Sequence, residues 1–223
     1  MAADQRRSKE TQFSGNCRDC ARLAAYLDNI RVRHPGYHAR PVAPFGDASA
    51  GLLVVGLAPG LHGANRTGRP FTGDSAGILL YETLYRFGFA SQSKASARDD
   101  GMRLTGCRIT NAVKCLPPEN RPRPDEVTRC NRYLRAELGA LPAGGAVLAL
   151  GHVAHAATLK ALALPARAYP FAHGARHVLP ANLTLYDSYH CSRYNTQTRR
   201  LSTAMFHDVV GAIAKDLLAS GSR

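Results

Sequence analysis

The chain has no apolar run long enough to cross a membrane. Its longest apolar runs, residues 52–58 and 146–150, have the length of a strand, whereas a membrane-spanning helix needs about 20 apolar residues. Residues 1–16 are polar and lack the apolar segment of a secretory signal. We therefore expect no membrane partner and a cytoplasmic location.

Acidic residues are scarce in this sequence. The 223 residues include 16 Asp and Glu against 29 Lys and Arg, which gives a formal net charge of +13. Such an excess favours polyanionic partners, because basic side chains displace condensed counterions from nucleic acid. Arg predominates over Lys, and its planar guanidinium suits phosphate. Apolar residues still make up 45% of the chain, which is enough to fill the core of one large domain.

Short apolar runs alternate with helix-like segments along the chain. The apolar runs cover residues 52–57, 107–113, 146–151 and 183–188, and the helix-like segments cover 77–89, 124–141, 152–164 and 201–219. This alternation predicts an α/β sandwich around a parallel sheet. Ligands of such sheets bind beyond the carboxyl ends of the strands. We therefore expect the functional site in the segments that follow residues 57, 113, 151 and 188.

The remaining segments predict a simple domain organisation. We expect one domain over residues 15–223, preceded by a flexible tail over residues 1–14. The polar stretch 91–103 predicts a surface loop. Four histidines near the third strand and the loop after it are expected to serve packing alone: His152, His155, His173 and His177.

The segment after the first strand, residues 56–74, is rich in glycine. Its sequence, GLAPGLHGANRTGRPFTGD, lets backbone amides approach a ligand closely. It lacks the lysine of a phosphate-binding GxxxxGK(S/T) loop. Asp74 ends the segment at the start of the predicted helix, where its carboxylate fits either an N-cap or a catalytic group.

Two other strand ends carry polar side chains suited to a site. Asn111 ends the second strand, and its amide offers both a donor and an acceptor, to a ligand or to a structural turn. His190 follows the last strand, close to three arginines, Arg193, Arg199 and Arg200. A loop of this kind can contact phosphates and push a side chain into a base stack.

Four cysteines have the spacing of a metal site. Cys17 and Cys20 form a Cys-x2-Cys pair, and Cys115 and Cys130 are separated by fourteen residues. Thiols in a cytoplasmic chain favour metal ligation over disulfides. Four thiolates can hold zinc or an iron–sulfur cluster, and the ligand type alone does not decide between them.

Taken together, these motifs resemble those of one enzyme family. The segments GLAPGLHGANRTGRPFTGD, TNAVKC and HCSRYNTQT resemble the motifs of the type 5 uracil-DNA glycosylases. The cysteine frame resembles the 4Fe–4S ligand set of the type 4 and type 5 enzymes, which implies a cluster held by Cys17, Cys20, Cys115 and Cys130. The resemblance implies a three-layer α/β/α sandwich with a four-stranded parallel sheet. It also implies a monofunctional enzyme that flips uracil, or other deaminated bases such as hypoxanthine, out of DNA and leaves an abasic site. We expect the chain to be a monomer.

The resemblance also implies roles for individual residues. Phe45 matches the aromatic residue that stacks on the flipped base, Asn111 the amide that reads the base edge, and His190 the histidine that contacts the base carbonyl. Asp74 matches the acidic residue that positions water. Further residues are expected to bind the base (Gly56, Leu57 and Ala58) or the DNA (Arg193, Asn195 and Arg199).

One departure from other glycosylase types bears on the mechanism. Leu57 is apolar where those types carry a polar residue after the first glycine, so the water-positioning role is assigned to Asp74. Two other functions compete with catalysis of this kind. A zinc-bearing nucleic-acid-binding module would not need Asp74, Asn111 and His190 at one sheet edge. An iron–sulfur redox enzyme would show a nucleotide fingerprint, and no GxGxxG motif follows a strand here.

Overall fold

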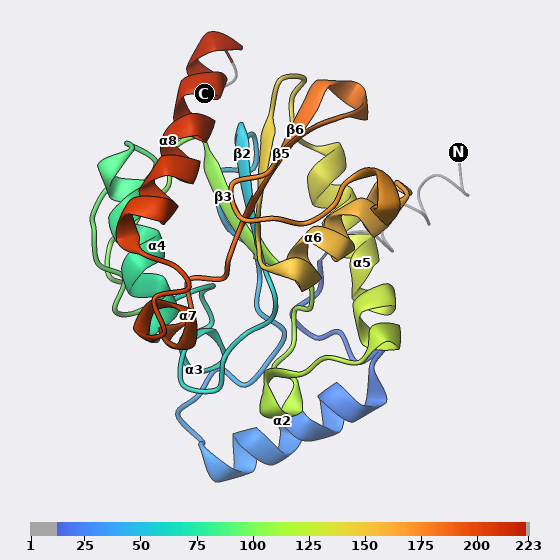
Figure 1. Ribbon diagram of the computed structural model, residues 1–223. Helices are drawn as coiled ribbons and strands as arrows, with labels where there is room; N and C mark the ends of the chain where they lie inside the picture. Colours follow the sequence, from blue (N-terminus) through green and yellow to red (C-terminus); the bar gives the residue numbers. More distant parts are fainter. Residues whose placement is uncertain (1–12, 222–223) are drawn as a thin grey trace.

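The computed structural model describes residues 13–221 and contains one six-stranded mixed sheet (Figure 1). The strand order is β1-β3-β2-β4-β6-β5. The four inner strands are parallel: β2 (Leu52–Gly56), β3 (Cys107–Asn111), β4 (Ala146–Leu150) and β6 (Leu183–Ser188). The two edge strands are antiparallel to their neighbours: β1 (Phe45–Gly46) and β5 (Arg176–Leu179).

The structure confirms the α/β class and corrects the number of strands. The parallel strands form where the continuous apolar runs predicted them, but the sheet has six strands rather than four. Strand β1 has two residues, too few to give a pattern. In strand β5 the side chains of Arg176 and Val178 are exposed, so no continuous apolar run marks it.

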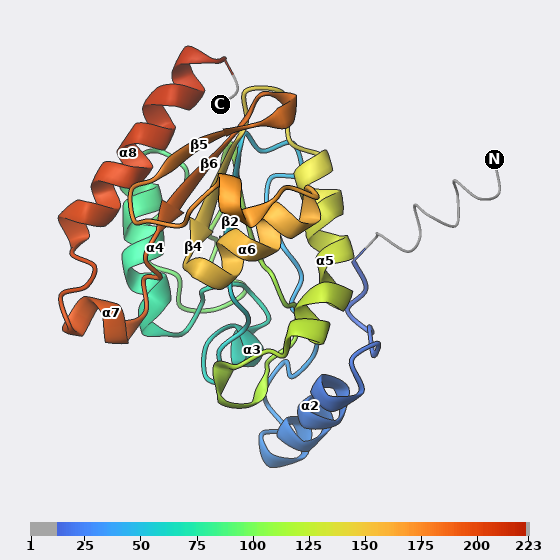
Figure 2. The same ribbon diagram turned by 45° about the vertical axis from the view of Figure 1, so that its right-hand side comes forward.

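Helices cover both faces of the sheet (Figures 1 and 2). Helices α4 (Ser75–Arg86) and α8 (Thr203–Ala219) pack on one face, against alternate side chains such as Val54 and Leu148. Helices α5 (Pro124–Gly139) and α6 (His152–Ala161) pack on the other, against Leu53 and Val147. Successive residues of a strand face opposite sides of the sheet, so one continuous apolar run contributes side chains to the hydrophobic cores on both faces.

Three smaller or peripheral helices lie at the carboxyl end of the sheet, at the bottom of Figures 1 and 2: α2 (Ala21–Arg33), α3 (Ala64–Thr67) and α7 (Arg193–Gln197). Helix α2 buries Leu27 and Ile30 against Leu116, which follows β3. Ser192 caps the start of helix α7, and its hydroxyl accepts a hydrogen bond from the amide of Asn195. These helices surround the edge where the sequence predicts the site.

The sequence predicts two irregular segments, a surface loop over residues 91–103 and a tail over residues 1–14. Residues 91–103 form a loop without helix or strand, as expected, and Asp100 in this loop pairs with buried Arg69 at 2.7 Å. Most of the expected tail over residues 1–14 lies outside the described residues. At its end Phe13 packs edge-on against Tyr133, with ring centroids 5.8 Å apart, so the packed part of the chain includes Phe13. Within the described residues, no helix combines the length and the apolarity needed to cross a membrane.

Candidate functional site

A cavity of about 530 Å³ opens at the carboxyl end of the sheet. Its volume lies in the range of small-molecule sites. Six residues that the sequence predicts for the site line this cavity: Leu57, Ala58, Asp74, Asn111, His190 and Arg193. They come from the segments after β2, β3 and β6. The segment after β4 does not line the cavity but supports it, because a Cβ on Gly151 would lie 3.6 Å from the Cβ of His190.

Asn111 lies buried at the end of β3, beside Gly56 at the end of β2. A Cβ on Gly56 would come within 2.4 Å of the Asn111 Oδ1 atom and 2.6 Å of the Phe71 Cζ atom. No side chain fits at position 56 without moving one of these two groups. Gly56 therefore serves the site by its lack of a side chain, which lets the amide and the ring meet at the cavity wall.

Phe71, and not Phe45, is the aromatic residue that lines the cavity. The Phe71 ring lines the cavity and stacks on His190, with centroids 5.8 Å apart and planes inclined by 29°. Phe45 is not among the cavity-lining residues, and its ring lies under the Arg69 guanidinium at 5.0 Å. Phe71 belongs to the same glycine-rich motif as Asp74. The presence of an aromatic residue within that motif was the sequence signal that could have identified Phe71 as a cavity residue.

Asp74 is both a helix cap and a cavity residue. Its Oδ1 atom accepts hydrogen bonds from the amides of Ala76 at 3.1 Å and Gly77 at 3.2 Å, which begins helix α4. Its Oδ2 atom faces the glycine-rich loop, where a Cβ on Gly63 would lie 2.0 Å away. One carboxylate oxygen therefore serves the fold, and the other is directed toward the cavity.

His190 is held from two sides. Its ring stacks on Phe71, and its backbone carbonyl accepts a hydrogen bond from the Asn195 side chain at 2.8 Å. Burial lowers the pKa of His190, and the nearby Asp74 carboxylate opposes this shift as the smaller effect. The imidazole is therefore neutral at pH 7 and can donate one hydrogen bond into the cavity.

The three predicted DNA-binding residues occupy different places. Arg193 is exposed and lines the cavity, and Arg199 is exposed with a left-handed φ of 57°. Asn195 is half-buried and braces His190 through the hydrogen bond above. Among the further cavity residues that the sequence did not single out are Asn120, which follows β3, and His62, whose Nδ1 atom lies 2.8 Å from the hydroxyl of Tyr37.

The four predicted metal-ligating cysteines line one small cavity beside α2. Their positions join the start of α2, the segment after β3 and the middle of α5: Cys17, Cys20, Cys115 and Cys130. The Lys114 amide donates a hydrogen bond to Cys130 Sγ at 3.3 Å, and the Arg132 guanidinium lies 3.9 Å from Cys17 Sγ. Donors of this kind stabilise thiolates.

The spacing of these thiols bears on the ion they could hold. Four thiolates around one zinc ion lie about 3.8 Å apart, given Zn–S bonds of about 2.3 Å. Among residues 13–221, the group of metal-ligand atoms within 4.8 Å of one another contains no cysteine. Burial, with a smaller effect from neighbouring thiols, raises the pKa of Cys20 to about 11. No three of the four thiol sulfurs lie as close together as the ligands of one zinc ion do.

Comparison with known proteins places the chain among DNA-repair enzymes. The model of the uracil DNA glycosylase superfamily matches residues 43–214. A type-5 uracil-DNA glycosylase of Thermus thermophilus is 46% identical over 199 residues, which cover 87% of this chain and 90% of that protein. A type-5 enzyme of Pyrobaculum aerophilum is 42% identical over 205 residues, covering 90% and 89%. A type-4 uracil-DNA glycosylase of Thermotoga maritima is 37% identical over 94 residues, covering 42% and 41%.

Proposed function

The chain belongs to the uracil-DNA glycosylase superfamily, and on this basis we propose that it excises uracil from DNA. It is a hydrolytic DNA glycosylase of base excision repair, since its type-5 relatives align over most of both chains. The observation that carries the proposal is the convergence of Asn111, His190, Phe71 and Asp74 on one cavity. None of the relatives named above supports the alternative of a zinc-bearing module without catalysis.

The base is recognised by an amide and held by a ring. A base inside a duplex is out of reach, so the enzyme extrudes it at a cost of a few kcal/mol. The Asn111 amide can pair one donor and one acceptor with the uracil edge. The ring of Phe71 stacks on the extruded base, and this contact offsets part of the cost of extrusion.

Departure of the base leaves negative charge on it, and the cavity offers donors for that charge. His190, neutral and held by Phe71 and Asn195, donates its N–H to the base carbonyl. The backbone amides of Leu57 and Ala58, in the loop after Gly56, are further donors at the cavity wall. Donors placed in advance, in a site that excludes water, stabilise developing charge strongly. The apolar side chain of Leu57 cannot activate water.

Asp74 acts on the sugar side of the bond. Its Oδ2 atom is free of the helix-capping contacts that occupy Oδ1, so it can orient the attacking water and stabilise the positive charge on the sugar. The bond between the sugar and the base breaks, the base leaves with the electron pair, and water supplies the new oxygen on the sugar. The DNA strand itself stays intact.

The charge of the protein provides affinity for the DNA backbone. The net charge of +13 and the exposed Arg193, Arg199 and Arg200 favour phosphate contacts around the cavity. Asn195 also braces His190, because its side chain donates a hydrogen bond to the His190 carbonyl. The cavity volume of about 530 Å³ leaves room for a purine, which supports excision of other deaminated bases such as hypoxanthine.

The cysteine cavity holds a 4Fe–4S cluster in this proposal. Cys17, Cys20, Cys115 and Cys130 would ligate it, and their shared cavity and wide spacing support this assignment over zinc. Hydrolysis transfers no electrons, so a bound cluster would supply a structural cross-link between α2, the segment after β3, and α5. The cytoplasmic location and the monomeric state stay predictions.

An oligonucleotide with a single uracil tests the activity. The proposal predicts strand cleavage at the uracil after alkali, and none without alkali, because an abasic site is the product. An otherwise identical oligonucleotide with thymine is the control, and one with hypoxanthine tests the wider range. Persistence of the intact uracil strand after alkali would contradict the proposed function.

A further inference from the structure

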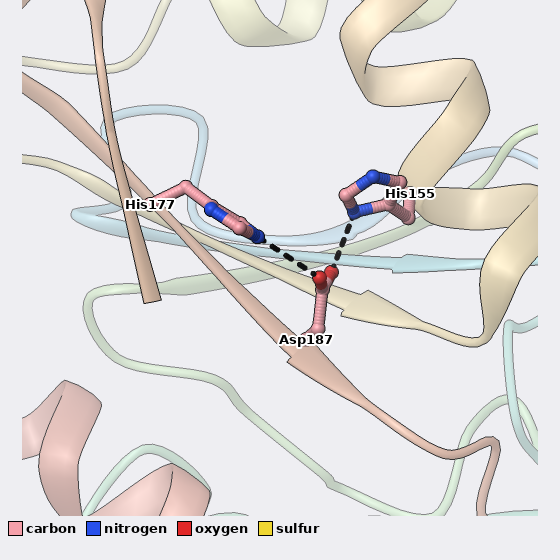
Figure 3. Close-up of side chains that lie close together, drawn as sticks. All are labelled: His155, His177 and Asp187. Carbon is pink, nitrogen blue, oxygen red and sulfur yellow. Dashed lines mark hydrogen bonds and ion pairs between the residues drawn. The ribbon is translucent and has the colours of Figure 1, made fainter. Parts of the chain in front are cut away.

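Two histidines and an aspartate form a buried group on the opposite side of β6 from α8 (Figure 3). His155 comes from α6, Asp187 from β6 and His177 from β5. The ring nitrogens and carboxylate oxygens that they offer all lie within 4.8 Å of one another. The side chain of Asp187 is fully buried, and those of His155 and His177 are 3% and 14% exposed. The glycosylase chemistry uses none of these residues.

The hydrogen bonds of His155 require either a second proton or a metal ion between it and Asp187. The Nε2 atom of His155 lies 2.9 Å from the carbonyl oxygen of Tyr169, which can only accept, so Nε2 carries a proton. In the neutral ring the Nδ1 atom then has a bare lone pair, and it faces the Asp187 Oδ1 atom at 2.8 Å. Two lone pairs repel at this distance, so either a second proton or a metal ion must lie between them.

The other two ligand atoms of the group make no hydrogen bond among residues 13–221 and share only the long contact of an ion pair. Asp187 Oδ2 and His177 Nε2 are buried, and neither has a hydrogen-bond partner within the described part of the chain. They lie 3.5 Å apart. Two ligands of a tetrahedral zinc ion, each bound at about 2.1 Å, lie about 3.4 Å apart. Buried polar atoms without partners are rare, and a missing ion is one of the accepted explanations.

We propose that His155, His177 and Asp187 bind a divalent cation of the zinc class. Imidazole and carboxylate are ordinary zinc ligands, and the Tyr169 carbonyl supplies the outer hydrogen bond that usually orients a ligating histidine. The metal ion replaces the proton between His155 and Asp187. These two side chains then move apart, from 2.8 Å to about the 3.5 Å that separates His177 Nε2 from Asp187 Oδ2. Water completes the coordination.

The cation would link three elements near the catalytic loop. It connects α6, β5 and β6, and Asp187 precedes His190 by three residues. Asp187 is also tied by backbone hydrogen bonds to Gly174 and Ala175. A bound ion would therefore fix the end of β6, from which His190 extends. This site is independent of the cysteine cavity and does not rest on the glycosylase activity.

Metal content of the purified full chain, equilibrated with micromolar zinc, tests the proposal. We expect about one zinc per chain at this site, with only nitrogen and oxygen neighbours in its X-ray absorption spectrum. His177→Gln, on an edge strand, should lose this zinc and keep the wild-type iron content. His152→Gln is the matched control, because His152 is an exposed histidine on the same helix as His155 and should leave the zinc in place.

A second measurement does not depend on counting metal. The three ligands of the proposed site come together only in the native state, so adding zinc should raise the melting temperature of the wild-type chain and of His152→Gln more than that of His177→Gln. The proposal is overturned by a wild-type chain without zinc, by a zinc ion with sulfur neighbours only, or by equal zinc in His177→Gln. Any of these results would leave a proton-held His155–Asp187 ion pair.

Discussion

The rings of Phe71 and His190 stack in the cavity wall, with their centroids 5.8 Å apart and their planes inclined by 29°. Phe71 belongs to the loop after β2, and His190 follows β6. The contact therefore joins two loops from distant parts of the chain. In the proposed mechanism it places the stacking surface for the base beside the donor that contacts the same base.

Replacing Phe71 with Ala should slow excision of uracil. The change removes the stacking surface and the support of His190, and base–aromatic stacking contributes about 1–3 kcal/mol. Single-turnover release of uracil should fall about 10- to 100-fold. Phe45→Leu, at the aromatic position outside the cavity, should stay within a few-fold of wild type. If Phe45→Leu were the more damaging change, the stacking role would return to Phe45.

The position of the cavity in the fold could be predicted from the sequence, whereas some of the residues that line it could not. Asn111 and His190 follow apolar runs long enough to mark parallel strands, and the carboxyl ends of such strands share one edge. Phe71 lies in an irregular loop and has a left-handed φ of 52°. No periodicity fixes where such a side chain points, and the stacking role was assigned to Phe45 from the resemblance alone.

The two edge strands of the sheet could not be predicted from the sequence for a similar reason. A strand is recognised by its pattern, and β1 is two residues long, while β5 exposes alternate residues on an edge. His155 and His177 were likewise given no role beyond packing. His155, His177 and Asp187 are far apart in the sequence, and only the pairing of β5 with β6 and the packing of α6 bring them together.

Asp74→Asn should separate the catalytic role of Asp74 from its role as a helix cap. Asn caps helices about as well as Asp, so the melting temperature should stay within a few degrees of wild type. The loss of the carboxylate charge should slow uracil release about 100-fold or more, with little change in DNA binding. Equal single-turnover rates in the two proteins would reduce Asp74 to a cap.

The pH dependence of excision should reflect the lowered pKa of His190. The neutral imidazole is the active form, and burial keeps it neutral as the pH falls past the ordinary histidine value of about 6.5. The single-turnover rate should therefore stay flat through pH 6.5 and decline only at lower pH. His190→Gln keeps an N–H donor that does not titrate, so its profile should lose this acid limb. An unchanged acid limb in His190→Gln would show that another group controls it.

Removing one cysteine of the small cavity should cost iron and stability together. Cys17→Ser should lower the iron content and lower the melting temperature by about 5 °C or more, because a cluster bound only by the native state is coupled to folding. Cys107→Ala is the matched control, since Cys107 is buried in the sheet core away from that cavity and should keep its iron. Full iron content in Cys17→Ser would remove Cys17 from the ligand set.

The most direct test is the release of free uracil from a uracil-containing oligonucleotide under single-turnover conditions, by the wild-type chain and by Asn111→Ala. Asn111 is buried in the cavity wall, and loss of its paired hydrogen bonds leaves the base edge unrecognised. We predict stoichiometric uracil from the wild type, and a rate at least about 100-fold lower from Asn111→Ala with DNA binding retained. No uracil from the wild type, or equal rates from both proteins, would contradict a uracil-excising site in this cavity.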